Sequence, residues 1–168
     1  MPHSIDVTIE IPRGERNKYE YDHEKHLIRL NRHLTSSMGY PADYGFIPET
    51  LGGDGDPLDV LVLTEYPTFP GCVISVRILG ALLMIDEHGD DTKLIAVPDY
   101  DPQWREAEEL TDVPSRVLDE IQHFFAHYKE LDQDRWVKVN GYELREGALR
   151  ELKQSEERYL GLGESASA

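Results

Sequence analysis

Cysteine, positive charge and long apolar runs are all scarce in this sequence of 168 residues. The one cysteine, Cys72, cannot form a disulfide within the chain, and we expect it to be a small buried hydrophobe. Lysine and arginine number 17 against 33 aspartates and glutamates, which gives a formal net charge of −16. Because such a surface repels polyanions, we expect neither nucleic acid nor an anionic membrane as a partner.

Targeting signals are scarce as well. The first residues, MPHSIDVTIEIP, lack the basic start and the apolar stretch of a signal peptide. No later apolar run approaches the length of a membrane span. We therefore expect the protein to reside in the cytoplasm.

The remaining composition predicts one domain over residues 1–168, with a tail that frays from about residue 161. Apolar and polar residues alternate through much of the first two thirds, as in VTIEIP, which is typical of half-buried strands. Apolar residues then recur at helical spacing between Pro114 and Leu131, and a second helix is expected from about Glu143 to Tyr159. Strands followed by helices favour an α+β fold, with a small barrel or curled sheet and helices packed outside it.

Aspartates are crowded in GGDGDPLDVLVL, where Asp54, Asp56 and Asp59 lie close together before a run of strand-forming residues. An EF-hand calcium loop does not fit, because Leu58 would take its fifth position, where an oxygen ligand belongs, and a strand follows instead of a helix. A solvated surface turn does fit, since Asp, Gly and Pro are ordinary turn residues. A bound cation is the alternative, because it would reverse the repulsion between the carboxylates.

Further carboxylates favour the cation. A second turn between apolar strands, IDEHGDDTK, carries Asp86 and Asp91, and Glu10 and Glu20 lie on the polar faces of two more predicted strands. Several acidic turns that meet at one end of a barrel would repel one another strongly without cations between them. Carboxylates without nearby cysteines indicate a hard ion such as Mg²⁺ or Mn²⁺, which uses a few carboxylates, water and phosphate oxygens of a substrate.

Cationic side chains alternate with these acidic ones, Lys18 with Glu20 and Lys93 with Asp91. A solvent-facing charge is the ordinary role of a single lysine, and that interpretation stays open for each of them. Taken together with metal ions, they suit a small and highly charged phosphate ester or anhydride as the ligand.

Four longer segments share their order and spacing with one known family: IEIPRGERNKYEYD, MGYPADYGFIPETLGGDGDPLDVLVL, DEHGDDTKLIAVP and HFFAHYKELD. They resemble the soluble family I inorganic pyrophosphatases of the bacterial type, whose signature is similar to DGDPLDVLV. The resemblance implies a five-stranded, OB-like distorted β-barrel with two C-terminal helices packed outside. It also implies a homohexamer and Mg²⁺-dependent hydrolysis of pyrophosphate to two phosphates, with pyrophosphate arriving as its magnesium complex and with Mn²⁺ or other divalent ions as possible substitutes.

The same resemblance implies roles for individual residues. Asp56 would be the general base that helps to deprotonate a metal-bridging water, and Glu10 would support the site from a neighbouring strand. The metal-binding carboxylates would be Glu20, Asp54, Asp56, Asp59, Asp86 and Asp91. The phosphates would be held by Lys18, Arg32, Tyr44, Lys93, Tyr128 and Lys129.

Two rival functions stay open on the residues alone. A cation-binding barrel without activity would have no use for clustered lysines, arginine and tyrosines. A phosphohydrolase of nucleotides or sugar phosphates would need a surface that reads a base or a sugar, and the sequence contains no glycine-rich P-loop.

The histidines receive no assigned role. His23 and His88 lie beside the expected site segments, where they would either tune metal preference and pH profile or be exposed turn residues. His123 and His127 stand one helical turn apart, and without a third ligand nearby we interpret them as helix-surface or interface residues.

Overall fold

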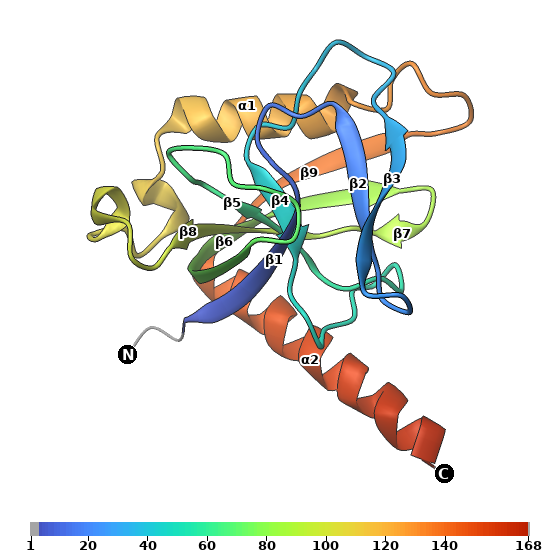
Figure 1. The fold of residues 1–168 in the computed structure, drawn as a ribbon. Helices are drawn as coiled ribbons and strands as arrows, with labels where there is room; N and C mark the ends of the chain where they lie inside the picture. The colour runs from blue at the N-terminus through green and yellow to red at the C-terminus, as the bar shows by residue number, and fades with distance from the viewer. Residues whose placement is uncertain (1–3, 168) are drawn as a thin grey trace.

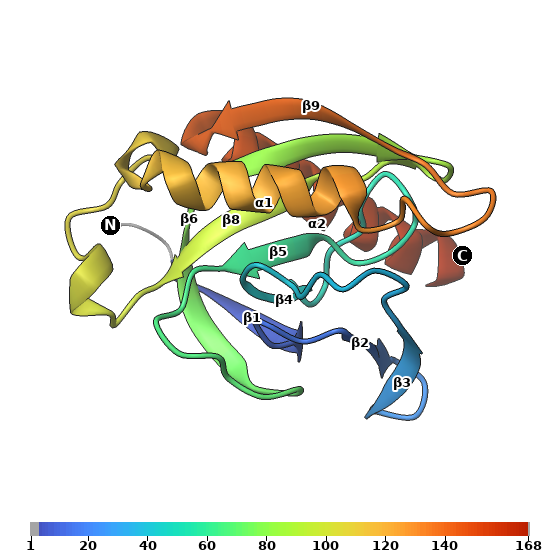
Figure 2. The same cartoon turned by 90° about the horizontal axis from the view of Figure 1, so that it is seen from above.

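The structure is a computed structural model that describes residues 4–167, with side chains described through residue 162. Five strands form a closed ring (Figures 1 and 2). In ring order they are β1 (Ile5–Ile11), β4 (Asp43–Phe46), β5 (Asp59–Val62), β8 (Lys93–Pro98) and β6 (Val73–Asp86). The ring closes because β1 pairs with both β4 and β6. The expected α+β fold with a distorted five-stranded barrel is therefore confirmed.

Alternation explains why β1 forms a wall of this barrel. Val7, Ile9 and Ile11 are buried, whereas Thr8 and Glu10 on the other face are only half-buried. β5 and β8 form the one parallel pair of the ring, which sets Asp59 directly opposite Lys93. This register brings a carboxylate and an ammonium group to the same end of the barrel.

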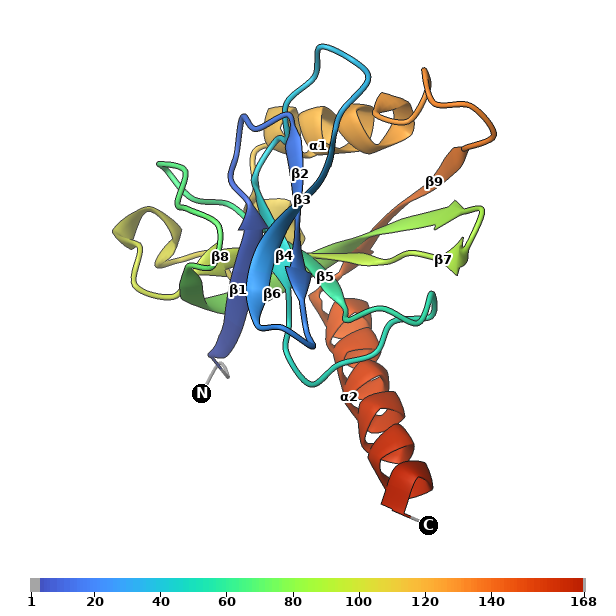
Figure 3. The same cartoon turned by 45° about the vertical axis from the view of Figure 1, so that its right-hand side comes forward.

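Four further strands extend from the barrel (Figure 3). β2 (Asn17–Asp22) and β3 (Leu27–His33) pair with each other as a separate antiparallel hairpin. β7 (Gly89–Asp90) and β9 (Val137–Leu144) both pair with β6. The strand β9, which lies between the two expected helices, was not expected from the sequence, and neither was the short strand β4.

Two α-helices pack outside the barrel. α1 (Ser115–His127) lies within the predicted range, and its expected apolar stripe is confirmed, since Ile121 and Phe125 are buried. α2 (Arg145–Ser167) begins two residues later than expected and continues past Tyr159. The expectation that the tail frays concerns motion and stays a prediction. No helix among the described residues is both long and apolar enough to cross a membrane.

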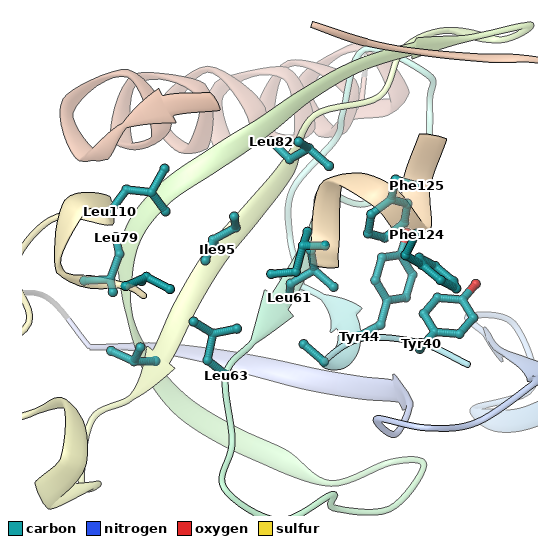
Figure 4. Packing of buried hydrophobic residues seen from close by; sticks show 14 of the residues in the cluster. Tyr40, Tyr44, Leu61, Leu63, Leu79, Leu82, Ile95, Leu110, Phe124 and Phe125 are labelled. Carbon is teal, nitrogen blue, oxygen red and sulfur yellow. The ribbon is translucent and has the colours of Figure 1, made fainter. Parts of the chain in front are cut away.

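The core consists of two clusters on either side of the sheet. One cluster lies under α1 and includes Tyr40, Tyr44, Phe124 and Phe125 (Figure 4). The other lies under α2 and includes Leu152. Cys72 packs against this second cluster, but it is only half-buried, whereas we expected it to be buried. Two short 3₁₀ helices, η1 (Pro102–Trp104) and η2 (Leu110–Asp112), connect β8 to α1.

Candidate active site

One cavity of about 350 Å³ collects every side chain that the sequence assigned to the site. Its wall is built by β1, the β2–β3 hairpin, β4, the loop before β5, the turn between β6 and β8, and the end of α1. The assigned residues that line it are Glu10, Lys18, Glu20, Arg32, Tyr44, Asp54, Asp56, Asp59, Asp86, Asp91, Lys93, Tyr128 and Lys129.

Carboxylates outnumber cationic side chains around this cavity. The eight carboxylates are Glu10, Glu20, Asp54, Asp56, Asp59, Asp86, Glu87 and Asp91. The five lysines and arginines are Lys18, Arg32, Lys93, Lys129 and Arg135. Three negative charges are therefore unbalanced when all of these groups are ionised, and divalent cations would neutralise them.

Lys93 is the most buried of the cations, with 2% of its surface exposed. Its Nζ lies 3.0 Å from Asp59 Oδ2 and 3.0 Å from Asp91 Oδ1, and it donates a hydrogen bond to Tyr44 Oη at 2.8 Å. Burial by itself would lower the pKa of Lys93, but Asp59, Tyr44 and Asp91 outweigh it and hold that pKa well above its usual value. Lys93 is therefore a fixed positive charge between two carboxylates.

Two other cations are held by acidic partners. Lys129 Nζ lies 3.2 Å from Asp86 Oδ2, at the point where α1 ends. Arg32 Nη1 lies 2.8 Å from Asp132 Oδ2, and Thr35 donates to the other oxygen of Asp132 at 2.7 Å. One side of the Arg32 guanidinium is thus anchored, which leaves its remaining N–H groups for a ligand.

Several carboxylates of the cavity resist ionisation. Burial raises the pKa of Glu10 to about 7, although the Tyr21 backbone N–H donates to its Oε2 at 2.7 Å. Burial also raises the pKa values of Asp54 and Asp91. A divalent cation bound at these oxygens would lower the pKa values again, because its charge stabilises the ionised form of each acid.

Tyrosine hydroxyls complete the inner wall. Burial raises the pKa values of Tyr44 and Tyr128 above their usual range, so both phenols are neutral at physiological pH. A neutral phenol can donate a hydrogen bond to a phosphate oxygen without adding charge.

The loop of residues 51–57, which we call the aspartate loop, carries Asp54 and Asp56. The Gly52 N–H donates to Asp56 O at 2.7 Å, and the Asp56 N–H donates to Asp54 Oδ1 at 3.1 Å. Gly55 has a φ of 89°, in the left-handed region that favours glycine, which allows this tight reversal. Both carboxylates are thereby turned toward the cavity, whose lining includes them.

Comparison with known proteins identifies the family. The family model described as inorganic pyrophosphatase matches residues 7–160. The inorganic pyrophosphatase of Methanosarcina acetivorans is 53% identical over 92% of this chain and 91% of its own, and that of Leifsonia xyli is 54% identical over 83% and 85%. The chain belongs to the inorganic pyrophosphatase family. The crystal structure of the Thermus thermophilus inorganic pyrophosphatase superposes with a TM-score of 0.91 at 49% identity, over 94% of this chain and 92% of that one.

The residues of this pyrophosphatase cavity fit a divalent metal that is only partly held by protein. Among the side chains described, those of residues 4–162, no three of His, Cys, Asp or Glu are grouped so that they could hold one ion by themselves. Mg²⁺ keeps several waters and takes the remaining ligands from one or two carboxylates and from substrate phosphates, so it needs no closed protein cage. The excess of carboxylates and the raised pKa values of Asp54 and Asp91 fit such an ion.

Eleven residues that line this pyrophosphatase cavity were not assigned to the site from the sequence, and four of them are considered next. Tyr40, Glu87, Asn31 and Arg135 all line it. Glu87 stands next to Asp86 in the acidic turn, and this position was the one signal in the sequence that could have assigned it to the site. Its Oε1 lies 3.6 Å from Lys129 Nζ. Asn31 donates to Glu20 Oε2 at 2.9 Å across the β2–β3 hairpin, a pairing that depends on the strand register.

The histidines divide as their sequence positions suggest. His23 and His88 both line the cavity, and His23 packs against Phe46 with ring centroids 5.1 Å apart. His123 is exposed and His127 is half-buried on α1, outside the lining of the cavity.

Proposed function

We propose that this protein hydrolyses inorganic pyrophosphate to two phosphates in an Mg²⁺-dependent reaction. One observation carries the proposal: eight carboxylates and five lysines or arginines surround a single cavity of about 350 Å³. Such a mixture suits a small polyanion that binds together with metal ions. The family name and the names of the relatives are consistent with this substrate.

Asp56 is the residue that we propose as general base. Its side chain is exposed at the tip of the aspartate loop, and in the described part of the chain its carboxylate has neither a hydrogen bond nor an ion pair. Mg²⁺, when bound near Glu20, Asp54, Asp56, Asp59, Asp86 and Asp91, supplies charge neutralisation and makes a water more acidic. The free carboxylate of Asp56 can then accept the proton of the attacking water.

The cationic and phenolic groups bind the substrate in this proposal. Arg32 offers the open side of its guanidinium to a phosphate, and Lys18 and Lys129 act as point charges. Burial lowers the pKa of Lys18, with Arg32 as the second cause, and an arriving polyanion would reverse that shift. Tyr44, Tyr128 and Lys93 form the inner wall, where they stabilise the charge that develops on the leaving phosphate. Glu10 supports the neighbouring hairpin through its bond to the Tyr21 N–H.

A cytoplasmic homohexamer that accepts Mn²⁺ or other divalent ions besides Mg²⁺ completes the proposal. Large apolar side chains that are exposed in the single chain support subunit contacts, among them Tyr66 at 74%, Phe69 at 63% and Tyr100 at 76% exposure. Sedimentation of the purified protein measures the number of subunits directly.

The deciding experiment is phosphate release from pyrophosphate by purified protein, first with Mg²⁺ and then with excess chelator. ATP serves as the competing substrate in parallel reactions. We expect fast release from pyrophosphate that the chelator abolishes, with little release from ATP. Absence of release with every divalent ion, from protein that is folded by circular dichroism, would instead favour the cation-binding barrel without activity.

A further inference from the structure

Helix α2 contacts the aspartate loop on the side away from the active-site cavity. The Leu51 N–H donates to the backbone oxygen of Ser155 at 3.0 Å. Arg158 Nε donates to the backbone oxygen of Leu51 at 2.8 Å. Both backbone polar groups of Leu51, the residue that opens the loop, are therefore bonded to one helix.

Arg158 is itself held in one orientation. One of its terminal nitrogens donates to Glu151 Oε1 at 2.6 Å and to Ser155 Oγ at 3.0 Å. Ser155 is fully buried, and its hydroxyl also donates to the Glu151 backbone oxygen at 2.9 Å. The planar guanidinium is thus fixed along one edge while its Nε reaches the loop.

A cavity lies beside the contact between the loop and the helix. It has a volume of about 210 Å³ and is lined by Gly52, Gly53 and Asp54 on one side and by Glu151 and Arg158 on the other. Asp54 also lines the active-site cavity, so it stands in the wall between the two spaces. The two hydrogen bonds of Leu51 therefore restrain the loop at the edge of this cavity.

We propose that Arg158 is a positioning residue that fixes the aspartate loop, and with it the carboxylates of Asp54 and Asp56, in the arrangement needed to bind divalent metal. The inference rests on the proposed function in so far as these carboxylates are taken as metal ligands. Loss of the Arg158 side chain leaves the Leu51 carbonyl without its partner beside the cavity, and the loop gains freedom at its first residue. Metal affinity falls because the carboxylates must then be ordered when the ion binds.

The test compares Arg158→Ala and Arg158→Lys with wild type, with Lys153→Ala as the matched control. Lys153 is exposed on the same helix, so its removal takes away the same charge and no contact to the loop. Hydrogen exchange of the loop amides is measured in metal-free protein. The Mg²⁺ concentration for half-maximal pyrophosphate hydrolysis and kcat at saturating Mg²⁺ are then measured separately.

For Arg158→Ala we expect the Gly52 and Asp56 amides to exchange roughly tenfold faster, the factor typical of one lost hydrogen bond, with amides of β5 and β8 unchanged. The half-maximal Mg²⁺ concentration should rise roughly tenfold, the lower end of the effect of residues that orient metal ligands, while kcat at saturating Mg²⁺ stays close to wild type. Arg158→Lys should have amide exchange rates and a half-maximal Mg²⁺ concentration between those of Arg158→Ala and wild type, because lysine cannot bond Leu51 and Glu151 in the same geometry.

Three results would overturn the inference. Unchanged exchange of the loop amides in Arg158→Ala would show that Arg158 does not restrain the loop. Wild-type behaviour of Arg158→Lys, or an effect of Lys153→Ala as large as that of Arg158→Ala, would show that charge alone matters. If Arg158→Ala does not fold, Glu151→Gln takes its place, because it weakens the hold on the guanidinium. It should change the exchange rates and the half-maximal Mg²⁺ concentration in the same directions by smaller factors. No change in either quantity would count against the inference. Failure of the wild type to hydrolyse pyrophosphate would reject the proposed function, whereas the exchange experiment would still decide the role of Arg158.

Discussion

At the scale of single residues, the buried charges of the cavity are balanced by direct ion pairs. Lys93 lies within 3.0 Å of carboxylate oxygens of both Asp59 and Asp91, so two acids that would repel each other share one cation. Asp56 is the opposite case, an exposed acid whose carboxylate oxygens have no partner in the described part of the chain. This contrast is why we assign proton transfer to Asp56 and not to either of the two acids that Lys93 holds.

The variant Asp56→Asn tests that assignment. The amide keeps the size and the backbone of the loop but cannot accept a proton from water, so turnover of pyrophosphate should fall to a residual level. Phosphate release at saturating Mg²⁺ gives the activity, and the thermal unfolding midpoint should stay near that of wild type. Retention of most activity by the folded variant would show that another group is the base.

Glu10 gives a prediction about stability and pH. Because burial raises its pKa to about 7, the folded state favours the protonated acid, and the stability that this contributes is lost as the pH rises from 4.5 through 7. Glu10→Gln should therefore stabilise the metal-free protein at pH 8 by up to roughly 3 kcal/mol, the equivalent of that shift. The glutamine oxygen can still accept the bond from the Tyr21 N–H.

Urea unfolding with chelator present, at pH 8 and at pH 4, measures this effect. The difference between variant and wild type should be large at pH 8 and small at pH 4, where the glutamate is protonated in both states. An equal difference at the two pH values would mean that ionisation of Glu10 is not its cause.

At the scale of elements, the close approach of β1 and β4 limits what residue 45 can be. A Cβ added at Gly45 would overlap the Thr8 backbone oxygen, and it would lie 2.9 Å from the Ile9 Cα. Gly45→Ala should therefore destabilise the fold by about 1–3 kcal/mol or more, because backbone atoms of a paired strand have to move. Denaturant unfolding of the variant measures the loss.

Gly161→Ala is the matched control for this prediction. Apart from the backbone of its own helix, a Cβ at Gly161 meets no described atom within 4 Å, and alanine is the better helix former, so stability should stay the same or rise slightly. A loss of stability in Gly161→Ala as large as that in Gly45→Ala would contradict the steric explanation.

Elements with an alternating, a continuous or a helically spaced apolar pattern were predicted from the sequence, whereas β4 and β9 were not. Alternation revealed β1, and helical spacing revealed α1. The four residues of β4 are all buried, so no alternation marks them as a strand. β9 is an eight-residue strand that follows the first helix, and it has few fully apolar positions. Its extended conformation is stabilised by pairing with β6, which the sequence of β9 alone does not reveal.

The candidate site shows the same limit. Its acidic turns and the lysines that alternate with them could be found from the sequence, because the residues of each group are neighbours in the chain. The anchoring of Arg32 by Asp132 joins residues 100 positions apart, and the bond from Arg158 to Leu51 joins residues 107 apart. No local pattern carries such pairs, since only the tertiary fold brings them together.

At the scale of the whole molecule, charge excess links metal binding to stability. The chain has a net charge of −16, and the cavity alone holds three more negative than positive groups when all are ionised. An ion that binds only the folded state should therefore stabilise it, by about 2.7 kcal/mol at a hundred times its Kd. Thermal unfolding with and without Mg²⁺ measures this gain.

Sodium chloride at matched ionic strength is the control, because it screens the surface repulsion without binding as a divalent ion. We expect a clearly larger rise of the unfolding midpoint with Mg²⁺ than with sodium chloride. Equal rises would mean that screening of the net charge, and not a specific site, accounts for the stabilisation.

Closure of the barrel by β1 and β6 has a consequence for biosynthesis. The cavity takes residues from Glu10 to Arg135, and no shorter part of the nascent chain contains them all. The N-terminal strand must wait for partners made much later, so its pairing with β6 is a late and non-local event. A ribosome-bound chain should therefore stay catalytically silent until most of its length has emerged, and regained activity should report barrel closure during refolding.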